Sequence, residues 1–279
     1  MNFKEFETGE SISKEEFEAQ LPSLRVDLVN TQYELRQAGF SVVILIGGDD
    51  RIAANELINS LNEWMDARYI GMHVFAEPTQ DERERPRFWR YWRQLPATGQ
   101  IGMFVGAWAM NPIAEQVFGK KDKASFKRRL EHNRLFEQTL VDEGTLLLKY
   151  WLHLPEKLHR KRAEAARDGD EHYWKFDDRD WKVYKILDKA LPLGEQLIEA
   201  TNTPSCPWQV IDTSNKRYRD LTVARSLLTA INTRLEESQK AAPAKGSPTA
   251  ATPDCLSGPL PGVDLPPNLR PQDHNKKLH

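Results

Sequence analysis

Apolar runs that suit buried strands alternate with helical patterns along most of this chain. The first run, SVVILI at 41–46, is continuous and rich in β-branched residues, which is typical of a strand buried on both faces of a parallel sheet. Because helical patterns separate the apolar runs, we expect βαβ crossovers and a mostly parallel five-stranded α/β sheet flanked by helices. The predicted strands cover 41–46, 73–76, 101–107, 145–152 and 208–212.

Specific residues mark where helices begin and end. Ser13 and Glu16 form a capping box that opens a helix running to about Ala38, and Pro22 predicts a kink or a division of that helix. Gly144 is a good terminator for a long helix in the middle of the chain. The helices expected after the first cover about 52–66, the part of 81–95 that follows Pro86, 123–142 and 216–237.

Three segments lie outside this alternation. Residues 1–12 are polar and are expected to be flexible, so the folded domain should cover 13–238. The stretch 156–202 begins with the basic sequence EKLHRKRAEAARDGD and predicts a helical insertion where many phosphotransferases carry a mobile lid. Residues 239–279 are rich in Pro, Ala, Ser and Gly, which predicts a disordered linker or tail.

Composition limits the class of protein. The chain has 279 residues, of which 39% are hydrophobic and 29% charged, as in a globular protein with one substantial domain. The formal net charge of −2 argues against nucleic-acid binding, and the absence of an apolar run of about 18 residues argues against a membrane span. Two cysteines, Cys206 and Cys255, and no apolar leader favour a cytoplasmic location. The histidines and cysteines show no metal-ligand spacing.

The segment after the first strand, GGDDRIAANE, is a candidate phosphate-binding loop. A strand, a glycine turn and a helix in this order bring backbone amides at a helix N-terminus to a bound phosphate. A working loop of this kind also needs a lysine for the β/γ-phosphates and a hydroxyl or an acid for Mg²⁺. Since this segment has no Gly-Lys pair, a plain tight turn is the alternative interpretation.

The rest of the chain resembles the polyphosphate kinase 2 family over about residues 13–238. The resemblance is to the N-terminal half of two-domain polyphosphate:AMP phosphotransferases, and it implies a thymidylate-kinase-like P-loop fold with a helical lid. It also implies polyphosphate and AMP or ADP as substrates and Mg²⁺ as cofactor. The stretches that carry it include LINSLNEWMDARYI, PTQDERERPRFWRYWRQLPATGQIGMF, LVDEGTLLLKYWLHL, YWKFDDRDW and NTPSCPWQVID.

Two family motifs are incomplete in this sequence. The family loop has the form Gly-x-Asp-x-x-Gly-Lys-Gly, of which Gly48 and Asp50 are kept here. Ala54 stands at the lysine position, between Ala53 and Asn55 at the two glycine positions. At the end of the third strand, Val105 replaces the family aspartate and Gly106 the arginine. The resemblance therefore implies a degenerate domain that docks on a second catalytic kinase domain or on a homo-oligomer partner.

The candidate site residues follow from this alignment. Asp50 is the candidate catalytic residue, and the candidate phosphate- or nucleotide-binding residues are Gly48, Asp50, Arg160 and Lys175. Two other functions stay open: a residually active AMP phosphotransferase, and an interaction module that binds no phosphate. A further basic cluster predicts either a solvated helix with an aromatic face or one wall of a channel for a long anion. It contains Arg83, Arg85, Arg87, Arg90 and Arg93.

Overall fold

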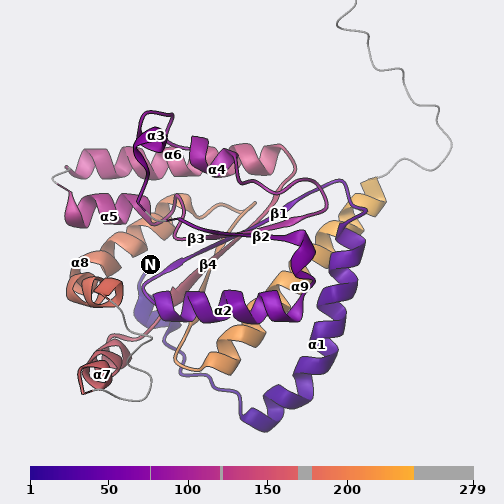
Figure 1. Ribbon diagram of the computed structural model, residues 1–279, viewed down its shortest axis with the longest axis horizontal. Helices are drawn as coiled ribbons and strands as arrows, with labels where there is room; N and C mark the ends of the chain where they lie inside the picture. Colours follow the sequence, from indigo (N-terminus) through magenta and orange to yellow (C-terminus); the bar gives the residue numbers. More distant parts are fainter. Residues whose placement is uncertain (76, 120–121, 169–177, 242–279) are drawn as a thin grey trace, which may run out of the picture. The chain divides into compact units, whose positions relative to one another are not determined.

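The computed structural model describes residues 1–75, 77–119, 122–168 and 178–241. Its centre is a five-stranded parallel sheet with the strand order β2-β3-β1-β4-β5 (Figure 1). The central strand β1 pairs with β3 on one side and β4 on the other, and its residues 42–46 are fully buried. The predicted parallel α/β sheet is confirmed. The strands are β1 (Val42–Gly48), β2 (Ile70–Val74), β3 (Ile101–Val105), β4 (Leu146–His153) and β5 (Trp208–Asp212).

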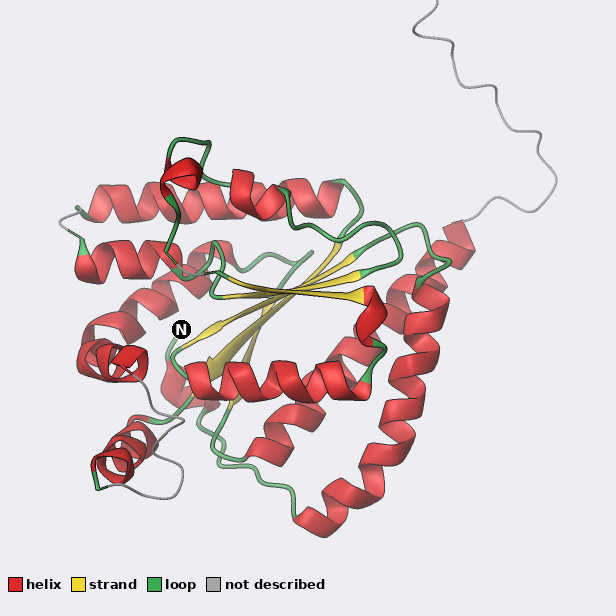
Figure 2. Ribbon diagram, viewed as in Figure 1, coloured by secondary structure: helices red, strands yellow, loops and turns green. Residues whose placement is uncertain are grey.

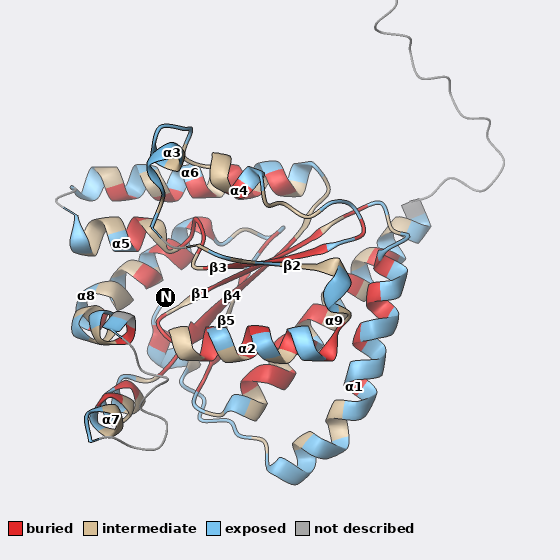
Figure 3. Cartoon of the chain, in the orientation of Figure 1, coloured by how far each residue is buried: buried red, intermediate tan, exposed pale blue. Residues whose placement is uncertain are grey.

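Helices cover both faces of this sheet (Figure 2). Alternate residues of β1 point to opposite faces, as the strand period requires: Ile44 joins a core with α1, α2 and α9, whereas Leu45 joins a core with α5, α6 and α8. Figure 3 shows the buried strands between these helices. The helices are α1 (Lys14–Leu35), α2 (Arg51–Trp64), α3 (Gln80–Arg83), α4 (Trp89–Trp92), α5 (Asn111–Phe118), α6 (Lys123–Asp142), α7 (Glu156–Arg167), α8 (Asp178–Thr201) and α9 (Lys216–Ala241), with 3₁₀ turns η1 (Phe3–Phe6) and η2 (Ala67–Tyr69).

Several helix boundaries differ from the predicted ones. The capping box of Ser13 and Glu16 is present, but α1 continues through Pro22 as one helix. Pro22 is exposed, so water can hydrogen bond to the carbonyl group that the proline leaves unpaired. The helix predicted after Pro86 is present as the single turn α4, and the structure adds another single turn, α3, before Pro86. The sequence analysis misses α5, which has a proline in its first turn.

The predicted insertion and the predicted loose N-terminus both contribute to the core. The insertion consists of α7 and α8 with an undescribed stretch between them, and Leu197 and Ile198 of α8 are buried against the sheet. Residues 1–12 are treated above as flexible, whereas Phe3 is only 3% exposed and its ring stacks on Trp151 at 5.3 Å between centroids. The Phe3 ring therefore packs the first turn of the chain against the sheet. The tail from residue 242 lies outside the described residues.

None of the helices in the described part of the chain is both long and apolar enough to cross a bilayer.

A buried ion pair links the sheet to two helices. Lys149 of β4 is fully buried, and its Nζ donates to Glu137 Oε2 of α6 at 2.8 Å and to the Thr201 carbonyl oxygen of α8 at 2.7 Å. Trp108 Nε1 donates to the other oxygen of Glu137 at 3.0 Å. Burial raises the pKa of Glu137, and the charge of Lys149 opposes that rise. Removing either charge would therefore leave the other one buried without an opposite charge.

Replacing Lys149 alone tests this dependence. Lys149→Met should lower the free energy of unfolding by about 3–5 kcal/mol, because the Glu137 carboxylate stays buried without its cation. The double variant Lys149→Met/Glu137→Gln should recover most of that loss, since no buried charge is left and Trp108 keeps an acceptor. Urea unfolding measures both. If the double variant is no more stable than the single one, the pair does not contribute through charge.

Candidate functional site

The site begins where β1 ends, at the close approach of two backbones. Gly48 has φ +133°, and a Cβ atom there would lie 2.1 Å from the Leu152 carbonyl oxygen of β4. Only glycine fits such a position. The amides of Asp49 and Asp50 both donate to the same carbonyl oxygen, at 3.1 and 3.3 Å. The loop between β1 and α2 is thus fastened to β4 by its backbone.

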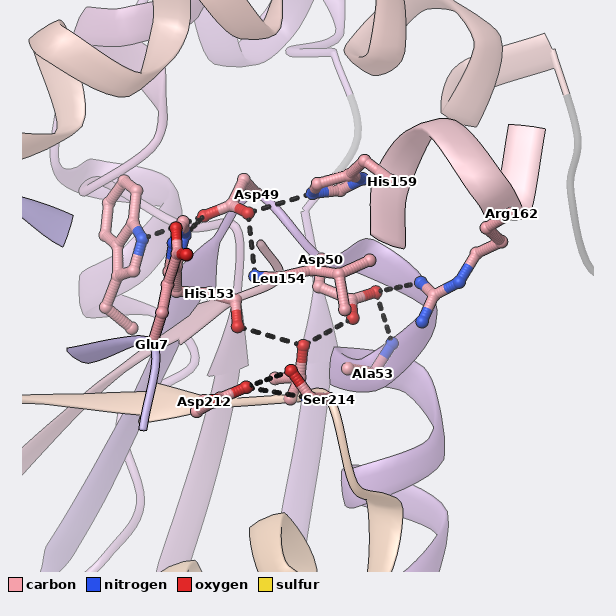
Figure 4. A network of polar contacts seen from close by, with 12 residues as sticks. Glu7, Asp49, Asp50, Ala53, His153, Leu154, His159, Arg162, Asp212 and Ser214 are labelled. Atoms are coloured by element: carbon pink, nitrogen blue, oxygen red, sulfur yellow. Dashed lines mark hydrogen bonds and ion pairs between the residues drawn. The ribbon is translucent and has the colours of Figure 1, made fainter. Parts of the chain in front are cut away.

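Asp49 is the most heavily hydrogen-bonded carboxylate of this loop. One oxygen accepts from Trp151 Nε1 at 3.1 Å and contacts His153 Nδ1 at 3.0 Å. The other accepts from the Leu154 amide at 3.0 Å and contacts His159 Nε2 at 2.9 Å (Figure 4). Burial alone would raise the pKa of Asp49, but the hydrogen bonds and charges of the two histidines outweigh it and lower the pKa to about 2. Asp49 is therefore a buried anion that joins β4 to α7.

His153 extends this network to the N-terminal segment. Its Nε2 lies 3.4 Å from Glu7 Oε1, and its ring stacks on Phe3 with centroids 4.8 Å apart. Burial works to lower the pKa of His153, but hydrogen bonds and charges from Asp49 and Glu7 raise it above the ordinary value of 6.5. The imidazolium form is stabilised between two carboxylates.

Asp50 connects the loop to three elements. Its Oδ1 accepts from the Ala53 amide at 3.0 Å, which caps α2, and from Arg162 Nη1 of α7 at 2.7 Å. Its Oδ2 accepts from the Thr213 hydroxyl after β5 at 2.7 Å. The residue is 2% exposed. Arg162, the Ala53 amide and the Thr213 hydroxyl therefore occupy both oxygens of the Asp50 carboxylate.

A second ion pair binds the loop to α8. Arg51 is the first residue of α2 and forms a bidentate pair with Asp180, with Nε–Oδ1 at 2.9 Å and Nη2–Oδ2 at 2.5 Å. Together with Arg162, this pair attaches both helices of the insertion to the loop. The bidentate geometry is the strong form of this interaction.

The structure brings together only part of the predicted site. Gly48 and Asp50 lie in the loop as expected, although no ligand role for them is tested. Arg160 does not reach the loop: its side chain is 61% exposed and pairs with Glu156 at 3.1 Å on the same helix. The residue that contacts Asp50 is Arg162, three positions after His159 and on the same helical face. Lys175 lies outside the described residues.

The sequence analysis misses Asp49, His153, His159 and Thr213, and it includes Arg162 only as part of the basic sequence of the insertion. One signal was available: His159 and Arg162 have i, i+3 spacing, so either both face the loop or neither does. Nothing in the sequence shows that His153, at the end of a strand, turns toward Asp49. The positions of Ala54 and Val105 are apolar and buried, at 6% and 8% exposure.

The loop carboxylates as arranged do not fit a Mg²⁺ site. Magnesium takes oxygen ligands, but the oxygens of Asp49 and Asp50 already accept from amides, an indole, a hydroxyl and a guanidinium or contact histidines. Among the residues that the structure describes, no group of three or more His, Cys, Asp and Glu is placed to hold a metal ion.

The raised pKa of His153 predicts how stability changes with pH. The folded state binds this proton more tightly than the unfolded state, so the stabilisation is complete below pH 6.5 and is lost as pH rises through the raised pKa. Each unit of the rise is worth about 1.4 kcal/mol. Asp49 affects stability at acidic pH. Its lowered pKa stabilises the folded state above pH 3.8, and this stabilisation is lost as pH falls through about 2.

Urea unfolding between pH 6 and 9 measures the histidine contribution. We expect His153→Gln to flatten the fall in stability over this range. His132→Gln, on an exposed position of α6, should leave the fall unchanged. A fall of the same size in His153→Gln would show that another group causes it.

The chain resembles known proteins in both sequence and fold. Residues 11–239 match the family model described as Polyphosphate kinase 2 (PPK2). The chain is 37% identical over 250 residues to the polyphosphate:AMP phosphotransferase of Pseudomonas aeruginosa, covering 89% of this chain and 50% of that protein. It is 33% identical to the protein of that name from Pseudomonas syringae pv. tomato, covering 99% of this chain and 56% of that protein.

A solved structure agrees with the sequence comparisons. The crystal structure of a putative polyphosphate kinase 2 from Pseudomonas aeruginosa superposes with a TM-score of 0.75 at 36% identity, over 84% of this chain and 47% of that one. The chain thus spans about half the length of the two curated Pseudomonas relatives that it matches. With the family model matched over most of its length, the chain belongs to the polyphosphate kinase 2 family.

Proposed function

We propose that this chain is the phosphate-binding but non-catalytic domain of a polyphosphate:AMP phosphotransferase, and that it supports a catalytic kinase domain of the same family. The reaction class comes from the family and from the names of the Pseudomonas relatives. The supported partner is either a second domain or another copy, because the chain spans about half of those relatives.

The observation that carries the non-catalytic part of the proposal is that the backbone amides of the β1–α2 loop already have acceptors within the protein. The amides of Asp49 and Asp50 donate to Leu152, and the Ala53 amide donates to the Asp50 side chain. In a working phosphate loop, backbone amides of this segment hold the phosphate instead. Here the loop presents two carboxylates, and a side chain of α7 contacts each of them, His159 at Asp49 and Arg162 at Asp50.

The side chains expected to do the chemistry support the same proposal. Ala54 stands where the family has its lysine, and Val105 where it has an aspartate for Mg²⁺. One electrostatic donor to the transition state is worth roughly 10²–10³ in rate. Both losses together would reduce phosphoryl transfer below about 10⁻⁴ of a normal rate, if the two effects multiply. Among the described residues, Ala54 and Val105 belong to a buried apolar cluster, which supplies no charge in place of the lost ones.

The assay is polyphosphate-dependent conversion of AMP to ADP with Mg²⁺ by the purified chain. We expect no turnover above background. Turnover that Asp50→Asn abolishes would contradict the proposal and identify a residually active phosphotransferase instead.

Phosphate binding is tested separately with labelled polyphosphate at two salt concentrations. We expect salt-sensitive binding that Arg162→Gln weakens at least tenfold, because Arg162 is the α7 cation that faces the loop. Arg160→Gln is the matched control on the same helix and should change affinity less than twofold. The absence of any binding would favour an interaction module that binds no phosphate.

A further inference from the structure

Arg87, between α3 and α4, has a buried guanidinium group without a hydrogen-bond partner. Its Nε, Nη1 and Nη2 each have less than 1 Å² of accessible surface, and none of the three has an acceptor among the described residues. The adjacent Phe88 stacks on Phe136 of α6 with centroids 4.4 Å apart, which holds this segment against the helix. Buried polar groups in folded proteins are almost always paired, so this cation requires an explanation.

The neighbouring arginines do have carboxylate partners. Arg129 of α6 pairs with Glu115 of α5 at 3.1 Å, and Arg90 of α4 lies 3.4 Å from Glu82. The Arg87 guanidinium has no hydrogen-bonded carboxylate among the described residues. Burial and the charge of Arg129 lower its pKa, and the charges of Glu115 and Tyr91 work against that fall. An uncompensated buried charge is strongly destabilising, whereas an anion at this point would offset it.

A neutral donor lies in the same cluster. Tyr91 is fully buried, and its hydroxyl oxygen accepts from Asn111 Nδ2 at 2.6 Å, which leaves the hydroxyl hydrogen available to donate. Electrostatic interactions couple Tyr91 to both Arg87 and Arg90. The planar guanidinium of Arg87 can donate to two oxygens of one anion at once, a geometry that suits phosphate.

We propose that Arg87, with Tyr91 and Arg129 beside it, forms a binding site for a phosphate group. The group comes either from inorganic phosphate or from a polyphosphate chain. The site is distinct from the β1–α2 loop and does not rest on whether that loop retains chemistry. It gives a role to one arginine of the 81–95 segment. Two others, Arg85 and Arg93, lie over the Trp89 ring, with Cζ 4.4 and 4.6 Å from the ring centroid. Since the Arg87 nitrogens are covered in this conformation, a ligand must displace neighbouring side chains to reach them.

Thermal unfolding of the chain and of Arg87→Met tests this site. In chloride buffer, Arg87→Met should unfold about 3 °C or more above the original chain, because a buried unpaired charge has become an apolar side chain of similar length. Addition of phosphate near 100 times its dissociation constant should raise the Tm of the original chain by roughly 5 °C. Arg87→Met should lack this rise, in buffers whose ionic strength is matched with chloride.

Three further comparisons decide the outcome. Arg85→Met, whose guanidinium is exposed and paired with Asp81, should keep the phosphate-dependent rise. Arg87→Lys keeps the charge but loses the planar group that donates to two oxygens, so phosphate should raise its Tm less than that of the original chain. If Arg87→Met fails to fold, Arg87→Lys takes its place in the comparison. A rise with orthophosphate identifies a single-phosphate site, and a rise with tripolyphosphate alone identifies a chain. Equal rises in Arg87→Met and the original chain would overturn the proposal, as would no rise with either ligand.

Discussion

The close approach of Gly48 to Leu152 is the constraint on which the site depends. A residue with a Cβ atom cannot occupy this position, because the added atom would lie 2.1 Å from a backbone oxygen. The approach lets one carbonyl of β4 accept from two successive loop amides. As a result Asp49 and Asp50 leave the sheet at a fixed point, where the carboxyl ends of β1 and β4 meet. Ligands of parallel sheets bind at this edge.

From that point the two adjacent carboxylates take different roles. Asp49 turns toward β4 and the first turn of the chain, where His153 and Trp151 contact it. Asp50 turns toward α2 and the end of β5, where Ala53 and Thr213 donate to it. Both also bind α7, through His159 and Arg162. The loop therefore serves as a charged junction between the sheet and the insertion, and the ionised state of Asp49 is part of the fold.

Much of the fold could be predicted because it depends on local patterns. The apolar run at 41–46 and the capping box at Ser13 act through neighbours in the chain, and the predicted bounds of α6 and β5 agree with the structure. Phe3 could not be predicted in the same way, since its burial depends on a stack with Trp151 far along the chain. Arg160, predicted to bind phosphate or nucleotide, does not contact the loop, and Arg162 does. Residues 160 and 162 differ by about 200° around a helix, so only the position of α7 decides which of them faces the loop.

The arrangement of charges also constrains how a phosphate could reach the loop. Two buried carboxylates lie there, and Asp49 remains ionised down to a pH of about 2, so an approaching phosphate meets like charge. The cations that could attract it, Arg162 and Arg51, are already paired with Asp50 and Asp180. A phosphate at this edge must therefore take a guanidinium from a carboxylate, and each exchange loosens a link between the loop and α7 or α8. Binding at the loop and the position of the insertion are for this reason coupled. A phosphate at Arg87 does not take that guanidinium from a carboxylate, because its nitrogens have no hydrogen-bond partner among the described residues.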